Sequence, residues 1–233
     1  CLIAQKNLIN QCIITTFEKY AKTASKTPPI PVIPKVITSD TLSSYIDSIK
    51  NVPIGINIYD ASVNKFDFTA NKISQIIGNN LLIENAFITN FVSIMSSIPN
   101  VNVKIIDFVG CISDNYGLDY VSGEFTANIS QIENESSEKS IVYILLGVGY
   151  IYDKVLDEGI DKLFSILDNL NNLQNKHFIF ADNYSSYKRI MKEDWYSKIV
   201  NNKSGIWIGK GVDIQNAIKF NSMSLSDVLI NIT

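Results

Sequence analysis

The sequence is poor in positive charge. Arg189 is its single arginine, and its 20 lysine and arginine residues are outnumbered by 23 aspartate and glutamate residues. The net charge of −3 and a pI near 5.2 indicate no basic face of the kind that binds a phosphate backbone. The composition therefore argues against a nucleic-acid-binding protein.

Long apolar segments are also missing. The longest apolar run, residues 141–151, has 11 residues, whereas a helix that crosses a membrane needs about 20. The N-terminus lacks the basic-then-apolar pattern of a secretory signal peptide. Because the chain begins with Cys1 rather than methionine, we expect it to be part of a longer protein.

Cysteine and histidine are too few and too scattered to indicate a metal site. Cys1, Cys12 and Cys111 lie far apart without C-x-x-C spacing, which favours buried thiols in a reducing cytosol over disulfides or zinc. His177 is the single histidine and lies at the start of a predicted strand, with no metal or catalytic partner at a telling distance in the sequence. There is also no G-x-S-x-G nucleophile motif. The sequence therefore predicts neither a metal centre nor a serine-hydrolase site.

The chain is nevertheless 46% hydrophobic, enough for a sizeable core. In residues 2–25, apolar side chains recur at helical spacing, which predicts an amphipathic helix. Four prolines follow within residues 28–34, and such a segment stops a helix and favours an extended strap. The strap fits either a surface connector or a domain boundary. Taking it as a boundary, we predict a linking helix and proline-rich strap over residues 1–39 and one domain over residues 40–233.

From residue 40 onward, predicted strands alternate with predicted helices. Residues 140–146 (SIVYILL) form a continuous apolar run, which is typical of a strand buried in a parallel sheet. The alternation predicts an α/β domain with a mainly parallel sheet and helices on both faces, in which strands 73–77 and 140–146 are neighbours. The other predicted elements are a short helix over 41–49 capped by Asp40 or Thr41, a hairpin over 53–59 and 65–68, strands over 102–109, 177–181, 205–209 and 217–220, and helices over 156–173 and 185–200.

The most informative segment is residues 72–98, whose layout matches a phosphate-binding loop. A strand over 72–77, a turn over 78–82 and an apolar helix over 83–98 are predicted. In this arrangement the motif G-x-x-x-x-G-K-[ST] holds nucleotide phosphates. Gly78 occupies the first glycine position. The other motif positions hold Ile83 in place of the second glycine, Glu84 in place of lysine and Asn85 in place of serine or threonine.

Each of these three replacements removes part of the nucleotide chemistry. Ile83 places a branched side chain where backbone amides approach an anion, and Glu84 places negative charge beside the phosphates. Asn85 lacks the hydroxyl that would hold magnesium. We therefore predict a P-loop NTPase-like fold with a degenerate nucleotide site. The alternative is an ordinary strand–turn–helix connection, which also occurs in α/β proteins without nucleotide sites.

A hydrolytic site also needs an acidic pair at the end of a buried strand, to hold magnesium and to orient water. The strand over residues 140–146 ends at Leu146 and Gly147, and the next carboxylate is Asp153. Leu146 and Gly147 are therefore degenerate acidic-pair positions. With both halves of the site altered, we expect no catalytic, cofactor-binding or metal-binding residue, and no ATP or magnesium unless the chain is an active motor.

Other polar residues at strand ends are interpreted as structural. Asp107 and Asp182 follow predicted strands, where acidic residues commonly cap the next turn. Lys210 lies in a Gly-Lys-Gly sequence that follows a strand but leads into no helix, so we predict a turn there.

The chain resembles a known family in its proline strap, its loop at residues 78–85 and its near-terminal sequence GIWIGKGVDIQ. The family comprises the C-terminal ATPase-like (FtsK/SpoIIIE-type) domains of type VII secretion coupling proteins, EssC/YukB-like. The resemblance covers nearly the whole chain, although the loop matches in position rather than in content. It implies a cytoplasmic domain of a membrane-anchored protein of Gram-positive bacteria, with several such domains in tandem and the last one often degenerate.

The resemblance also implies partners and functions. The implied partners are upstream ATPase domains of the same chain, secreted substrate proteins and an oligomer of the parent protein, with no nucleic acid and no direct membrane insertion. One function is a non-hydrolysing domain that contributes to substrate recognition or regulates the upstream ATPase domains. A second is an active ATP-binding motor for protein or DNA, which Glu84, the missing acidic pair and the acidic pI oppose. A third is a structural domain that only packs against its neighbour. The first and third remain open.

Overall fold

The computed structural model describes residues 2–20, 35–84, 86–112, 132, 137–154, 157–169 and 174–220. The chain divides into two compact units, Cys1–Val32 and Ile33–Thr233. The first unit contains α1 (Leu2–Tyr20), so the predicted helix is confirmed as far as Tyr20. The proline strap lies outside the described residues. No helix in the described ranges is both long enough and apolar enough to cross a membrane.

Taken by itself, α1 buries none of its described side chains. Leu8, Ile9, Ile13 and Ile14 are between 56% and 65% exposed. Cys12 is exposed on the same helix, so the prediction that its thiol is buried is wrong. Periodicity indicates which face of a helix is apolar, but it does not indicate what covers that face.

Five strands form the main sheet of the second unit, in the order β4-β5-β6-β3-β7. Every pairing between them is parallel, which confirms the predicted mainly parallel sheet. The strands are β3 (Ile73–Gly78), β4 (Val101–Asp107), β5 (Ser140–Leu146), β6 (Lys176–Asn183) and β7 (Gly205–Ile208).

Two sequence-based predictions about this sheet are wrong. β3 and β5 are not neighbours, because β6 lies between them and pairs with both. All three strands are largely buried and have an apolar central part, so their composition does not distinguish their order. The strand predicted over residues 217–220 is absent: Ala217 and Ile218 are buried in a bend that is closed by Gln215, whose side chain bonds to both N and O of Ile218.

A separate antiparallel hairpin, β1 (Val52–Ile56) and β2 (Val63–Phe66), forms as predicted. It is preceded by α2 (Ser39–Ser43), whose N-cap is Thr38. The Thr38 side chain accepts from the Thr41 backbone, and the Thr41 hydroxyl accepts from the Thr38 backbone. This capping box begins α2 before the predicted caps Asp40 and Thr41, and the helix ends well before residue 49.

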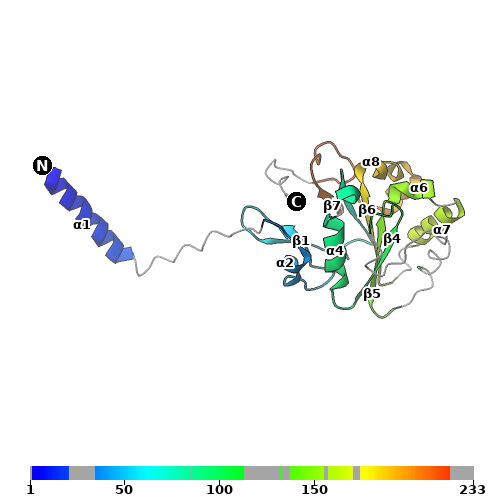
Figure 1. The fold of residues 1–233 in the computed structure, drawn as a ribbon, viewed down its shortest axis with the longest axis horizontal. Coiled ribbons are helices and arrows are strands. Elements are labelled where there is room, and N and C mark those ends of the chain that lie inside the picture. Colours follow the sequence, from blue (N-terminus) through cyan, green and yellow to red (C-terminus); the bar gives the residue numbers. More distant parts are fainter. Residues whose placement is uncertain are drawn as a thin grey trace. The chain divides into compact units, whose positions relative to one another are not determined.

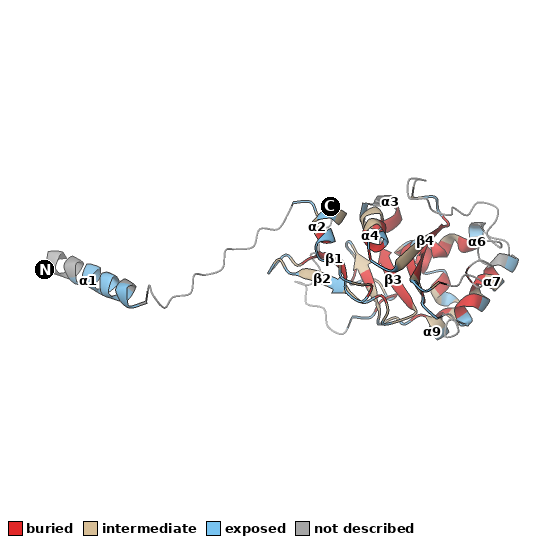
Figure 2. Cartoon of the chain, turned by 90° about the horizontal axis from the view of Figure 1, so that it is seen from below, coloured by how far each residue is buried: buried red, intermediate tan, exposed pale blue. Residues whose placement is uncertain are grey.

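Helices cover both faces of the sheet, with α4 (Ala86–Ser96) on one face and α7 (Asp157–Asp168) on the other (Figure 1). The short helix α3 (Leu81–Glu84) precedes α4. Figure 2 shows buried residues along β3 and on the inner sides of α4 and α7. Alternate strand residues face opposite ways. They therefore divide into two hydrophobic clusters, one beneath α7 and one beneath α4.

The single helix predicted over residues 185–200 is wrong. This segment is broken into α8 (Tyr184–Tyr187), the 3-10 helix η4 (Ile190–Lys192) and α9 (Asp194–Ile199). The break lies at Glu193, whose backbone is extended (φ −78°, ψ 141°). Apolar spacing continues across the break, which is why the sequence indicated one helix.

Gln75 of β3 is a polar side chain buried in the cluster beneath α7. Its Oε1 accepts from the hydroxyls of Tyr187 (2.8 Å) and Tyr196 (2.9 Å). Its Nε2 donates to the carbonyls of Asn201 and Ser204, both at 3.2 Å. The amide thereby uses its full bonding capacity and joins β3 to α8, to α9 and to the segment that precedes β7.

Candidate functional site

All five parallel strands end at one edge of the sheet, and the predicted nucleotide position Gly78 lies at that edge. Gly78 at the end of β3 pairs with Asn183 of β6 on one side and with Ile208 of β7 on the other. Leu146 at the end of β5 pairs with Ala181 of β6. Open α/β sheets bind ligands at the carboxyl ends of their strands. The loop after β3 and the acidic-pair positions after β5 thus share one edge, with β6 between them.

The glycine of the loop is required by packing against β7. A Cβ at Gly78 would lie 2.6 Å from the Ile208 carbonyl oxygen. The next residue, Asn79, donates from Nδ2 to the carbonyl of Lys210 at 2.8 Å. Lys210 lies in a bend, as predicted. The start of the loop is therefore fixed to the end of β7.

Leu81 and Leu82, within the described part of the loop, make contacts with the protein's own groups. The side chains of Leu81 and Leu82 are both buried, each 4% exposed. The backbone N–H of Leu82 donates to Oδ1 of Asn183 at 3.0 Å, in a buried contact. A phosphate loop offers its backbone amides to an anion. Here the Leu82 amide is paired with a side chain of the neighbouring strand.

The other three predicted loop positions come next in the chain. Ile83 and Glu84 belong to α3, and Asn85 lies between α3 and α4, outside the described residues. The consequences drawn for these three residues from the sequence therefore stay predictions.

The exit from β5 is a tight turn packed against its neighbours. Leu146 is fully buried, and Gly147 has a left-handed backbone (φ 74°) where an added Cβ would overlap Val109. The 3-10 helix η2 (Val148–Tyr150) follows and leads into α6 (Ile151–Lys154). Within η2, a Cβ at Gly149 would overlap the backbone carbonyl of Ser186. This turn therefore lies flush against α8.

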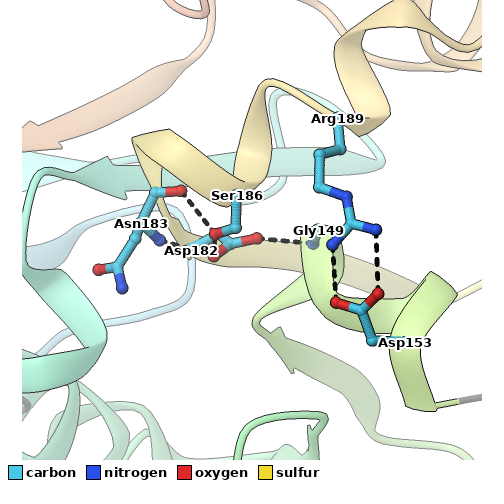
Figure 3. A network of polar contacts seen from close by, with 6 residues as sticks. All are labelled: Gly149, Asp153, Asp182, Asn183, Ser186 and Arg189. Atoms are coloured by element: carbon cyan, nitrogen blue, oxygen red, sulfur yellow. Dashed lines mark hydrogen bonds and ion pairs between the residues drawn. The ribbon is translucent and has the colours of Figure 1, made fainter.

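Asp182 of β6 links the segment that follows β5 to the segment that follows β6 (Figure 3). It is fully buried, and its Oδ2 accepts from the backbone N–H of Gly149 at 2.7 Å. Its Oδ1 accepts from the backbone N–H of Asn183 at 2.7 Å and lies 2.5 Å from Oγ of Ser186. The carboxyl thus caps turns, as predicted, and also connects β5 to β6.

Burial raises the pKa of Asp182 to about 6, while the Ser186, Gly149 and Asn183 contacts act in the opposite direction. The geometry also fits a protonated carboxyl. Oγ of Ser186 lies near both Oδ1 of Asp182 and the carbonyl of Asn183 (2.9 Å), but a hydroxyl has one proton to donate. If the protonated carboxyl of Asp182 donates to Oγ of Ser186, the Ser186 hydroxyl can donate to the carbonyl of Asn183. Both oxygen atoms then accept a hydrogen bond. This arrangement suits a structural acid rather than a metal ligand.

Arg189, which follows β6, and Asp153, which follows β5, form a second link between these two segments (Figure 3). The guanidinium donates to both carboxylate oxygens, at 2.7 and 3.1 Å. The two side chains are 43% and 50% exposed, so solvent screens the pair and its contribution to stability is small. The single arginine of the chain therefore serves an intramolecular contact.

Asp107 at the end of β4 caps its own turn, as predicted. Its oxygens accept from the backbone N–H groups of Val109, Gly110 and Ile112, at 2.8–2.9 Å. Burial and the neighbouring Asp107 charge raise the pKa of the Cys111 thiol to about 12. Cys111 is therefore a thiol rather than a nucleophilic thiolate at neutral pH.

His177 lies near the start of β6, as predicted, at the opposite edge of the sheet. Burial, with a smaller effect of the Lys72 charge, lowers the pKa of His177, which favours a neutral imidazole. Within the described ranges, no group of three or more histidine, cysteine, aspartate or glutamate side chains is placed to hold a metal ion.

An apolar groove between α2, β1 and α4 was not predicted. Its volume of about 20 Å³ has room for one group about as large as a water molecule. On α4, Phe87 and Phe91 have stacked rings 6.0 Å apart. The spacing of the apolar residues on α4 was visible in the sequence, but the contact of α4 with α2 and β1 was not. The main lining residues are Ile37, Leu42, Ile54, Phe87, Phe91 and Ile94.

Comparison with solved structures finds ATPase domains of type VII secretion proteins. EssC (ATPases 2 and 3) from Geobacillus thermodenitrificans has a TM-score of 0.60 and 12% identity, over 89% of this chain and 43% of that chain. The cytoplasmic domain of EssC has a TM-score of 0.59 and 11% identity, over 90% and 46%. EccC (ATPases 2 and 3) from Thermomonospora curvata, solved in complex with a signal sequence peptide, has a TM-score of 0.52 and 13% identity, over 80% and 38%.

At these identities the likeness shows the fold, an α/β P-loop NTPase-like domain, as predicted. The resemblance inferred from the sequence is thereby confirmed at the level of the fold. The chain spans less than half the length of each of the three structures. No protein-family model matches the sequence, and comparison with curated proteins gives no match.

Proposed function

We propose that this domain acts in type VII secretion through protein contacts and not through ATP hydrolysis. The observation that carries the proposal is the contact that the loop after β3 makes with β6. Leu81 and Leu82 are buried there, and the Leu82 amide is bonded to Asn183. On the other side of β6, Leu146 and Gly147 supply no carboxylate for a metal. A motor domain without nucleotide chemistry can still bind other proteins through its surface. This domain therefore contributes to recognition of secreted proteins or to regulation of upstream ATPase domains.

The proposed ligand is an apolar peptide segment of a secreted protein. The EccC structure of the same fold was solved with a signal sequence peptide, which supports a peptide ligand. In this chain the groove between α2, β1 and α4 offers an apolar surface for one anchoring side chain. At its rim, Asn90 is already bonded to the backbone N–H of Ser39 at 3.4 Å. The groove therefore favours an apolar anchor over a charged one.

The alternative function is an active ATP-binding motor, as the fold of the neighbouring structures suggests. Isothermal titration of the full chain with Mg-ATP separates the two. We expect no binding up to millimolar ATP, because the Leu82 amide is already bonded to Asn183 and the side chains of Leu81 and Leu82 are buried. Glu84→Lys alone should not produce hydrolysis, since Asn85 and Gly147 supply no group for magnesium. Micromolar ATP binding would contradict the proposal.

Peptide binding is tested by fluorescence anisotropy with labelled apolar signal-sequence peptides. Phe87→Ala removes a large lining side chain and should weaken binding by about tenfold or more. Tyr59→Ala is the matched control, because Tyr59 is an aromatic residue outside the groove and is 64% exposed. Equal effects of the two substitutions, or no peptide binding by the wild type, would remove the groove as the recognition site.

A further inference from the structure

We infer that the contact between Asn183 and Leu82 holds α4 in place without a nucleotide, so that the groove is formed whether or not ATP is present. Asn183 is then a positioning residue for peptide recognition, although it lies at the sheet edge and does not line the groove. The inference rests on the proposed function for its peptide ligand. Its structural part, the immobilisation of α4, stands separately.

α4 connects the two regions. It supplies Phe87, Phe91 and Ile94 to the groove, and it directly follows α3 and the loop. Leu81 and Leu82 of α3 belong to the same hydrophobic cluster as these groove residues. A shift of α3 would therefore reach the groove through continuous packing, because close-packed interiors transmit displacement.

Asn183 is itself held firmly. It is 5% exposed and is the last residue of β6, a strand with neighbours on both sides. Its backbone N–H donates to Asp182, and its carbonyl accepts from Ser186. Its side chain thus extends a fixed point of the sheet to the first turn of α3.

This arrangement determines whether a bound nucleotide can change the position of α4. In a phosphate loop, the bound anion completes the backbone contacts that lead into the helix, so the helix position can depend on the ligand. Here Asn183 completes the contact. A ligand shifts a conformational equilibrium only by its differential affinity for the two states. Because Asn183 makes this contact with or without ATP, ATP does not favour one position of α4 over another. Peptide recognition by this domain is therefore independent of nucleotide.

The test compares Asn183→Ala with Asn201→Ala in the full chain. Both remove an asparagine side chain, but Asn201 bonds to Asn71 and to the backbone N–H of Lys203, and it is not part of the loop or of α3. We expect Asn183→Ala to speed hydrogen exchange in residues 86–96 and to weaken binding of the labelled peptide by about fivefold or more. Asn201→Ala should change neither. Asn183→Asp keeps an acceptor for Leu82 and should restore slow exchange, which distinguishes positioning from general loss of stability.

Mg-ATP at millimolar concentration should change neither exchange nor peptide affinity in the wild type. Unchanged α4 exchange in Asn183→Ala, or ATP-dependent exchange in the wild type, overturns the inference. If Asn183→Ala speeds α4 exchange but no peptide binds the wild type, the immobilisation of α4 stands and the proposed function fails.

Discussion

The burial of the Asp182 side chain makes the free energy of unfolding depend on pH. Its pKa is about 6 in the folded protein, above the ordinary value of 3.8. Between these values the folded state binds more protons than the unfolded state. The free energy of unfolding therefore falls by about 3 kcal/mol as pH rises through this window, and the stabilisation is fully present only below about pH 4.

We expect Asp182→Asn to remove this dependence, because asparagine does not titrate. Urea unfolding of both proteins at about pH 4 and about pH 7 measures the effect. Relative to the variant, the wild type should lose about 2.5 kcal/mol between the two pH values. Asp60 and Asp67, whose pKa values are lowered, are present in both proteins and cancel in the comparison. A difference that is constant with pH would show that Asp182 is ionised throughout.

Among the elements, η2 and α8 lie in close contact, and Gly149 allows it. Gly149→Ala would force the Ser186 backbone away and should cost about 2–3 kcal/mol. Gly55→Ala is the control, since no atom lies within 4 Å of its added Cβ. It should change stability by no more than about 0.5 kcal/mol. Thermal unfolding followed by circular dichroism measures both, and equal midpoints for the two variants would contradict the packing argument.

Local patterns predicted individual elements better than their arrangement. The apolar run of β5 and the strand–turn–helix from β3 into α4 are encoded within short windows, and both were predicted from the sequence. The insertion of β6 between β3 and β5 depends on pairing between distant segments, and apolar composition does not select it. The same limit applies to the candidate site. Gly78 was located from its motif position, whereas the contact of Asn183 with Leu82 joins residues 101 positions apart.

At the scale of the whole molecule, this chain matches less than half of the multidomain structures that share its fold. We propose that the exposed apolar side chains of α1 dock on an upstream ATPase domain of the parent protein. A helix face with several aliphatic residues more than half exposed is most stable when a neighbour covers it.

We expect that deleting this domain from the parent protein abolishes secretion of its substrates, while ATP hydrolysis by the upstream domains continues. Exchanging it for the domain of a relative with different substrates should switch the secreted set. Secretion assays and ATPase assays on the same variants measure the two outcomes. An unchanged secreted set after both manipulations would leave this domain only a packing role.

The strand order has a consequence for synthesis on the ribosome. β3 ends at Gly78, but its two partners in the sheet begin only at Lys176 and Gly205. At a synthesis rate of about 5–20 residues per second, this interval lasts on the order of ten seconds. Throughout it, a strand whose six residues are all buried in the finished domain has no partner. The nascent chain is thus open to aggregation before the domain can close, and a holdase chaperone that covers β3 would be needed most before β6 leaves the ribosome.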